Sequence, residues 1–210
     1  MVKTKPFDEN ASRYEDWFER NTFAFKSELQ AIREQMPEKS NNGIEIGVGS
    51  GRFAAPLGIK IGIDPSKTMR EIAQKRGIEV IAGIAESLPF GDSQLDFALM
   101  ITTLCFVDDI AASFQEAYRV LKPGGILIIG FIERESPIGR LYQQHKNESL
   151  FYQIATFYTV DEVVSNLKKV GFKHFNFTQT LFHNLAEIRD IEPIRVGYGE
   201  GSFVVIRAIK

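Results

Sequence analysis

The sequence lacks most of the residues from which proteins build disulfides and metal sites. It contains one cysteine, Cys105, and three histidines among 210 residues. A single cysteine excludes an internal disulfide and a cysteine-built metal site. The histidines show no HxH or HExxH spacing that would bring two of them to one ion. We therefore expect no bound metal.

Long apolar runs and an excess of positive charge are also missing. No stretch approaches the roughly 20 apolar residues of a membrane-spanning helix, and the first residues, MVKTKPFDENASRYEDW, lack the apolar run of a secretion signal. The formal net charge is −2, whereas non-specific binding of nucleic acid needs many lysines and arginines. These absences predict a cytoplasmic protein without membrane insertion or a nucleic-acid partner. No sequence feature specifies the oligomeric state.

What the sequence does contain is an alternation of short apolar runs and helical patterns. The hydrophobic content of 44% and charged content of 25% are typical of an ordinary globular domain. Such alternation is typical of β-α-β units that build a parallel sheet. The last two apolar runs, FKHFNFTQTLF and GSFVVIRAI, have no helix between them, which indicates antiparallel pairing. We predict an α/β fold: a Rossmann-like, doubly wound, mostly parallel sheet with helices on both faces and a C-terminal antiparallel strand pair.

Helical periodicity divides the chain further. It predicts one amino-terminal helical stretch from about Ser12 to Glu34, and a later helix that Asp108 or Asp109 caps. We expect a single domain over residues 1–210. Its parts are an N-terminal helical cap (1–40), a cofactor-binding core (41–132), a lid or substrate segment (133–158), and a C-terminal helix with antiparallel strands (159–210).

Three glycines at alternate positions, Gly47, Gly49 and Gly51, follow the first apolar run. In doubly wound sheets the turn after the first strand is the usual seat of a cofactor. Glycine there permits both a tight turn and a close approach of the ligand to the backbone. Asp64 ends the next apolar run, where a carboxylate accepts hydrogen bonds from both hydroxyls of a ribose. The pattern predicts a nucleoside cofactor, with a ligand-free glycine turn as the plainer alternative.

The spacing of the glycines argues against a dinucleotide. The dinucleotide pattern is G-x-G-x-x-G, and its third glycine allows close packing of the following helix. Here Arg52 stands at that position, and Pro56 lies near the end of a very short helix. The chain is also short for a second, substrate-binding domain. An NAD-dependent oxidoreductase is therefore disfavoured.

Four motifs together resemble those of a known family. They are IEIGVGSGRFA, GIDPS, GIAESLPFGDSQLDFAL and FQEAYRVLKPGG. Their order and spacing are similar to those of class I S-adenosylmethionine-dependent methyltransferases, in particular the small-molecule family of the ubiquinone and menaquinone biosynthesis enzymes. The resemblance covers about residues 43 to 130. It implies S-adenosylmethionine as cofactor, S-adenosylhomocysteine as product, and in-line transfer of a methyl group to a nitrogen, oxygen or carbon atom of a small molecule.

The resemblance also implies roles for residues around the cofactor. Glu45 would organise the glycine turn and the cofactor's amino group, and Asp64 would hold the ribose. An aspartate that contacts the adenine in the family is here Ile84, which weakens binding modestly unless Glu86 or another group substitutes. Pro65 would flank the adenine, and Ala85 would offer its backbone to the adenine edge. The predicted cofactor-binding residues are Glu45, Gly47, Gly49, Gly51, Asp64, Pro65, Ile84, Ala85, Glu86 and Ile101.

No residue stands out as a catalytic base. Methyl transfer from a sulfonium depends mainly on holding the nucleophile in line, so a base is optional. A histidine pair that many relatives carry is replaced here by Cys105 and Phe106. Tyr14, Tyr142 and His145 are the remaining candidates. Each has a plainer explanation, as a core aromatic residue or a surface histidine.

Two other functions stay open from the sequence. The missing aspartate and histidines fit a non-catalytic S-adenosylmethionine-binding regulatory module, and an NAD-dependent oxidoreductase is the weaker alternative. No residue selects the methyl acceptor. Small amines such as histamine, quinone precursors and carboxylates are all substrates within the superfamily that the chain resembles.

Overall fold

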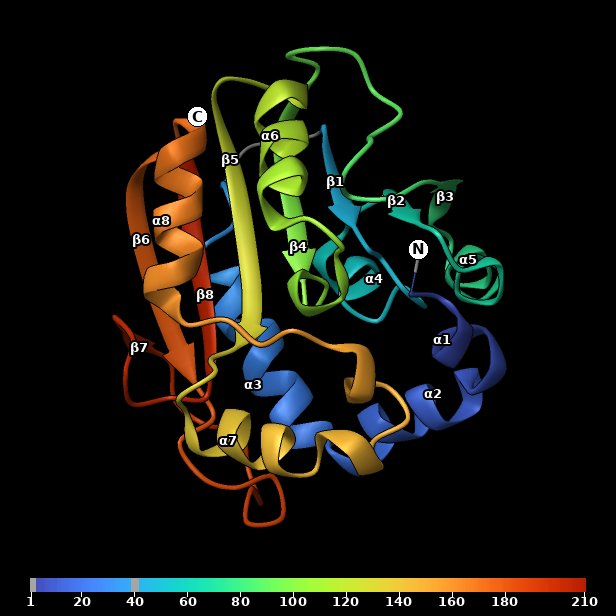
Figure 1. Cartoon of the computed structure of the whole chain (residues 1–210), viewed down its shortest axis with the longest axis vertical. Coiled ribbons are helices and arrows are strands. Elements are labelled where there is room, and N and C mark those ends of the chain that lie inside the picture. The colour runs from blue at the N-terminus through green and yellow to red at the C-terminus, as the bar shows by residue number, and fades with distance from the viewer. Residues whose placement is uncertain (1–2, 39–41) are drawn as a thin grey trace.

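The computed structural model of the chain, described here for residues 3–38 and 42–210, contains an eight-stranded sheet (Figure 1). The strand order is β3-β2-β1-β4-β5-β8-β6-β7. Strands β1 to β5 pair in parallel, whereas β8 runs antiparallel to both β5 and β6. The predicted Rossmann-like sheet and its C-terminal antiparallel pair are confirmed. The strands are β1 (Gly43–Ile46), β2 (Ile61–Asp64), β3 (Glu79–Ala82), β4 (Leu95–Ile101), β5 (Leu121–Ile132), β6 (Lys173–Thr180), β7 (Arg195–Val196) and β8 (Phe203–Ile209).

Helices cover both faces of this sheet. Residues of β5 show why: Leu127 and Ile129 bury against α6 and α8, whereas Ile128 faces a second core with α2, α3, α5 and α7. All three side chains are fully buried, which accounts for the continuous apolar run of this strand. The helices are α1 (Lys5–Glu9), α2 (Ala11–Arg20), α3 (Thr22–Arg33), α4 (Ala54–Leu57), α5 (Lys67–Lys75), α6 (Ile110–Val120), α7 (Pro137–Gln144) and α8 (Val160–Val170).

The N-terminal helices lie beyond the carboxyl ends of the strands. Figure 1 shows α1, α2 and the segment that contains α7 on the side to which the arrowhead of β5 points. A phenylalanine of α1 ties these segments together, because the ring centroid of Phe7 lies 5.2 Å from that of Phe151 and 5.0 Å from that of Phe106. The segments before β1 and after β5 therefore meet over the same edge of the sheet.

The structure corrects the prediction of one continuous helix from Ser12 to Glu34. Two helices, α2 and α3, occupy this region and Asn21 separates them, while Asn10 separates α2 from the preceding α1. Each asparagine turns its side-chain amide back onto a carbonyl four residues earlier, Asn10 onto Pro6 (3.1 Å) and Asn21 onto Trp17 (2.9 Å). Asparagine side chains that satisfy helix-end carbonyls favour termination over continuation.

Other local predictions agree with the structure. Of the two candidate caps, Asp109 caps α6, because its carboxylate accepts hydrogen bonds from the backbone of Ala111 (2.9 Å) and Ala112 (3.0 Å). The sequence analysis missed β7, a two-residue strand at the sheet edge. Part of the turn predicted over PEKSNNG, residues 39–41, lies outside the described residues. Within 3–38 and 42–210, no helix combines the length and hydropathy that crossing a bilayer requires.

Replacing Gly51 with alanine is expected to destabilise the fold. A Cβ at this position would overlap the Ile78 side chain and lie 3.3 Å from Ala73 Cβ on α5, and the backbone φ is +81°. Gly58 has a similar φ of +77° with nothing near its added Cβ, so Gly58→Ala measures backbone strain alone. Gly51→Ala should lose about 1–3 kcal/mol more unfolding free energy than this control, as overpacking does. Urea titrations compare the two variants, and equal losses would contradict the packing argument.

Candidate functional site

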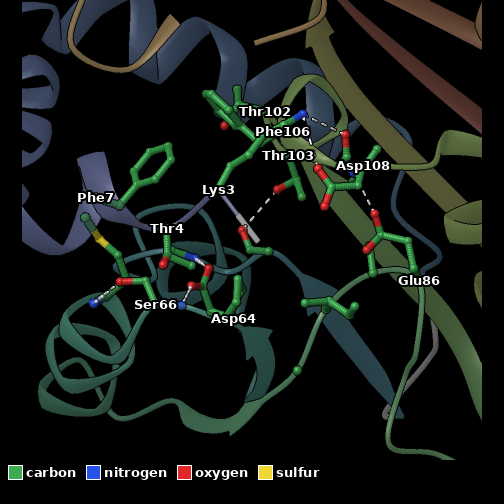
Figure 2. Close-up of a pocket in the computed structure, with 18 of the residues that line it drawn as sticks. Lys3, Thr4, Phe7, Asp64, Ser66, Glu86, Thr102, Thr103, Phe106 and Asp108 are labelled. Carbon is green, nitrogen blue, oxygen red and sulfur yellow. Dashed lines mark hydrogen bonds and ion pairs between the residues drawn. The ribbon is translucent and has the colours of Figure 1, made fainter. Parts of the chain in front are cut away.

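A cavity opens at the carboxyl ends of β1, β2 and β4, where the strand order reverses direction. This is the position at which open α/β sheets bind ligands. Figure 2 shows this cavity with most of its lining residues. The lining comprises Lys3, Thr4, Phe7, Tyr14, Gly47, Gly49, Asp64, Pro65, Ser66, Met69, Gly83, Ile84, Ala85, Glu86, Thr102, Thr103, Phe106, Val107 and Asp108. We call it the cofactor cavity.

Two of the three predicted glycines line this cavity. A Cβ on Gly47 would overlap the Thr103 side chain, whose hydroxyl donates a hydrogen bond to the Gly47 carbonyl (3.1 Å). Gly49, at φ +53°, would place a Cβ 3.3 Å from the Tyr14 hydroxyl. Gly51 does not line the cavity, and a side chain at this position would point toward α5. The turn thus leaves its backbone bare toward the cavity at Gly47 and Gly49.

Asp64 joins the tip of β2 to the glycine turn. Its Oδ2 accepts a hydrogen bond from the Gly49 backbone and its Oδ1 from the Ser66 backbone, both at 2.8 Å. Burial raises the pKa of the Asp64 carboxyl to about 6, although these two backbone hydrogen bonds act in the opposite direction. Each carboxylate oxygen can accept a further hydrogen bond, since a carboxylate offers about four acceptor positions.

Glu45 lies behind the turn and not along the cavity. Its side chain is 1% exposed, and its Oε2 has no hydrogen-bond partner among the described residues. Burial, together with the nearby charge of Asp64, raises the pKa of Glu45 well above its ordinary value. A buried polar atom without a partner is unusual in folded proteins.

The region predicted to hold the adenine is mainly backbone and apolar surface. Pro65, Ile84 and Ala85 all line the cofactor cavity. Glu86 lines it too, but its Oε1 accepts hydrogen bonds from the backbone of Asp108 (2.7 Å) and Asp109 (3.2 Å), so it fixes this loop (Figure 2). Ile101, also predicted to contact the cofactor, is 2% exposed and belongs to the core below the cavity.

The N-terminal segment closes over the cofactor cavity. Figure 2 shows Lys3 reaching the loop that contains Asp108, with an ion pair of 3.6 Å. Asp8 accepts a 2.6 Å hydrogen bond from the hydroxyl of Ser66, the residue that caps α5. Hydrogen bonds to the N-cap region of α5 thereby hold α1 beside Asp64.

Arg52 explains the departure from the dinucleotide pattern. Its guanidinium donates to Glu15 (2.8 Å) and Glu19 (2.9 Å), both on α2. Arg76 reaches the same Glu15 carboxylate and donates to the Ser50 carbonyl (2.5 Å). These ion pairs join α2 to the glycine turn and to α5, which is a structural role for the residue that replaces the third glycine.

A second and larger cavity of about 700 Å³ adjoins the first. Much of its wall is aromatic, with rings from the N-terminal helices, from the segment after β5 and from β5 itself. We call it the aromatic cavity. Its lining comprises Phe7, Arg13, Tyr14, Trp17, Phe18, Arg20, Asn21, Glu28, Phe53, Thr102, Leu104, Cys105, Phe106, Phe131, Ile132, Tyr142, His145, Glu148, Ser149, Leu150, Phe151, Tyr152, Thr156, Phe157, Tyr158 and Leu185.

The three catalytic candidates all line the aromatic cavity. Tyr14 also lines the cofactor cavity, and burial with the charges of Glu45 and Asp64 raises the pKa of its phenol. Tyr142 stacks on Tyr152 with ring centroids 4.5 Å apart, and burial raises the pKa of Tyr142 to about 12. His145 is exposed, and its Nδ1 lies 3.1 Å from the Leu141 carbonyl. The geometry therefore brings Tyr14 closest to the cofactor cavity and leaves His145 at the rim.

Comparisons with known proteins identify the family. A family model described as a methyltransferase domain matches residues 44–129. A solved structure from Thermotoga maritima, described as a SAM-dependent methyltransferase and possible histamine N-methyltransferase, is 50% identical, covers 98% of each chain and has a TM-score of 0.95. This chain belongs to the S-adenosylmethionine-dependent methyltransferases. The predicted family and cofactor are thereby confirmed.

Relatives in other organisms span nearly the whole methyltransferase chain or its greater part. An uncharacterised protein of Methanocaldococcus jannaschii is 46% identical over 204 residues, covering 97% of this chain and 98% of the relative. The 2-phytyl-1,4-naphtoquinone methyltransferase of Nostoc punctiforme is 29% identical over 163 residues and 70% of each chain. The resemblance to quinone methyltransferases thus extends beyond the cofactor motifs.

The residues of the cofactor cavity fit S-adenosylmethionine. Gly47 and Gly49 line this cavity with backbone alone, and the Asp64 carboxylate beside them can accept further hydrogen bonds from hydroxyl groups. Glu45 does not line this cavity, so its role at the cofactor's amino group stays a prediction. Ribose hydroxyls are donors that the Asp64 carboxylate can accept.

Several lining residues escaped the sequence analysis. Lys3, Thr102 and Thr103 reach the cofactor cavity from segments without a local motif. Thr102 has a positive φ of 51°, a rare conformation for a β-branched residue, which only the structure reveals. Glu28 in contrast had a sequence signal, because a charged residue interrupts the apolar face that Ala24 and Ile32 define one turn on either side.

Binding of S-adenosylhomocysteine is expected to weaken in acid. Since the Asp64 pKa is about 6, its ionised fraction falls about tenfold between pH 7.5 and pH 5, and the protonated acid is the poorer acceptor for ribose hydroxyls. Asp64→Asn should bind over tenfold more weakly at pH 7.5 and lose this pH dependence. Isothermal titration measures both, with the exposed Asp161→Asn of α8 as the control. Wild-type affinity in Asp64→Asn would remove the ribose assignment.

Proposed function

We propose that this methyltransferase transfers the methyl group of S-adenosylmethionine to a nucleophilic atom of a small molecule that occupies the aromatic cavity. The observation that carries the proposal is a shared wall. Four residues line both cavities, namely Phe7, Tyr14, Thr102 and Phe106. A molecule in the aromatic cavity therefore meets the cofactor cavity at these residues.

Exclusion of water is the main contribution of the shared wall to the reaction. The bound cofactor supplies an electrophilic methyl carbon. The chain's residues hold the acceptor against it in an apolar enclosure, and proximity with orientation can contribute about 7–11 kcal/mol to such a reaction. Phe7 and Phe106 pack edge to face at 5.0 Å on this wall, which keeps the meeting point of the two cavities apolar.

Proton transfer is a minor part of the proposed chemistry. Burial raises the pKa of both Tyr14 and Tyr142, so these phenols stay protonated near neutral pH and act as hydrogen-bond donors. Burial also raises the pKa of the Cys105 thiol to about 12, which disfavours a thiolate nucleophile. The positions of the family's histidine pair thus contribute apolar surface and no base.

The size of the aromatic cavity supports a small acceptor. A volume of about 700 Å³ lies within the range of small-molecule sites, about 300–1,000 Å³. The Nostoc punctiforme relative acts on a phytyl naphthoquinone by its name, and the Thermotoga maritima relative is described as possibly acting on histamine. Both compounds contain an aromatic ring, and an aromatic wall suits either ring.

Transfer of a labelled methyl group tests the proposal. Incubation of the protein with methyl-labelled S-adenosylmethionine and a small-metabolite extract should yield a labelled low-molecular-weight product and S-adenosylhomocysteine. Asp64→Asn should produce neither at the same cofactor concentration. A protein that binds S-adenosylhomocysteine but labels no compound would instead support the non-catalytic regulatory module.

Substitution of Tyr14 is expected to slow the reaction, whereas substitution of His145 is not. Tyr14→Phe removes a hydroxyl at the wall shared by the two cavities, and loss of about 1 kcal/mol from one neutral hydrogen bond corresponds to a roughly fivefold lower kcat. The pH profile should not change, since the phenol is protonated throughout. His145→Ala should stay within twofold of wild type because the imidazole is exposed at the rim. A large loss in His145→Ala together with a lost pH limb would make His145 the base.

A further inference from the structure

One carboxylate of the aromatic cavity has no partner. Glu28 on α3 lines this cavity and is 2% exposed. Its carboxylate forms no hydrogen bond and no ion pair with any residue in the ranges 3–38 and 42–210. Buried carboxylates are costly unless they are paired. An unpaired, buried carboxylate beside an open cavity therefore indicates a ligand that supplies the missing partner.

Glu192, a second buried carboxylate that contacts α3, has the hydrogen-bond partners that buried carboxylates usually have. Glu192 accepts a hydrogen bond from the Phe182 backbone (2.6 Å) and contacts the His183 imidazole. Its own backbone N–H donates to the Ser27 hydroxyl (2.8 Å), one residue before Glu28. The fold therefore supplies partners to Glu192 and to Ser27, and it supplies none to Glu28.

Packing fixes Glu28 in place. Ala24 and Ile32, one helical turn before and after it, are 1% and 0% exposed, so this face of α3 cannot rotate the carboxylate out to solvent. Burial raises the pKa of the Glu28 carboxyl to about 8. Its negative charge in turn contributes to the raised pKa of Tyr142, after burial as the larger cause. The carboxylate and the Tyr142 phenol therefore face the same space.

The other charged groups of the aromatic cavity lie at its exposed rim. They are Arg13, Arg20, His145 and Glu148. Solvent screens charges in that position, whereas the Glu28 carboxyl is buried inside the cavity. The other titratable groups of the lining all have a raised pKa and are neutral near pH 7, namely Tyr14, Cys105, Tyr142, Tyr152 and Tyr158. The interior thus presents one carboxyl group among aromatic faces, and pairing with a bound cation would favour its ionised form.

We propose that Glu28 binds a cationic nitrogen of the methyl acceptor, so that the acceptor is a small amine. A carboxylate surrounded by aromatic rings attracts an ammonium group by ion pairing and by cation–π contact. Glu28 does not line the cofactor cavity, so it holds a part of the acceptor away from the methyl carbon and determines specificity. This inference rests on the proposed function only in taking the bound cation to be the methyl acceptor. Binding of a cation at Glu28 is tested separately.

Matched pairs of probes test the proposal. The protein is saturated with S-adenosylhomocysteine, and isothermal titration measures 2-phenylethylamine against 2-phenylethanol and tryptamine against tryptophol. At least one amine should bind at least tenfold more tightly than its alcohol. Glu28→Gln should remove this preference and leave affinity for the alcohol within threefold. Glu34→Gln, an exposed carboxylate at the end of the same helix, should retain it.

Stability provides an independent measurement. Because the folded carboxyl has the higher pKa, folding costs more as the pH rises from the unfolded value of about 4.5 to about 8. Glu28→Gln should therefore melt at a higher temperature than wild type at pH 8.5, by several degrees, and the difference should shrink at pH 5.5. Glu28→Met should show the same trend and the same loss of amine preference. A destabilised Glu28→Gln would indicate that the carboxylate has a structural partner.

The outcomes separate this inference from the proposed function. If neither amine binds better than its alcohol, or if Glu28→Gln keeps the preference, the inference is wrong even when labelled methyl groups reach a neutral acceptor. If amines bind through Glu28 but no compound is methylated, the cation site stands and the proposed function fails. Binding and labelled methyl transfer to an amine, both lost in Glu28→Gln, support the two together.

Discussion

The two hydrogen bonds that Asp64 accepts are the contacts on which the cofactor cavity depends. One carboxylate oxygen accepts a hydrogen bond from the Gly49 backbone N–H and the other accepts one from the Ser66 backbone N–H, each at 2.8 Å. The first bond fixes the glycine turn after β1, and the second fixes the start of α5. Because both bonds end on the tip of β2, they tie the turn, the strand and the helix together.

The N-terminal helices extend this frame over the cavity. Arg52 and Arg76 attach α2 to the glycine turn through Glu15, and Asp8 attaches α1 to Ser66. Ionic contacts near the turn thus hold the cap, while aromatic side chains further out form its inner surface. Residues of α1 and α2 line both cavities, and Glu28 of α3 lines the aromatic cavity, so the N-terminal helices border both spaces.

Local patterns in the sequence predicted the sheet and the cofactor cavity well, because each pattern has a local physical cause. The alternation of apolar runs with helical patterns predicted a mostly parallel α/β sheet. The positions of Gly47, Gly49 and Asp64 follow from the geometry of the turn after β1 and the end of β2. The aromatic cavity was less predictable. Thr102, Phe7 and Glu28 come from three distant segments, and only tertiary packing brings them to one space. Ile101, another predicted cofactor residue, is buried in the core, and strand position alone does not tell which face of β4 a residue occupies.

Phe7 carries a consequence for the entry of the two reactants. It sits on a five-residue helix, and its ring borders both cavities. Displacing this helix to open the cofactor cavity would also remove the Phe7 ring from the wall of the aromatic cavity. If the reactants enter by displacement of this helix, entry of one reactant would alter the walls of both cavities.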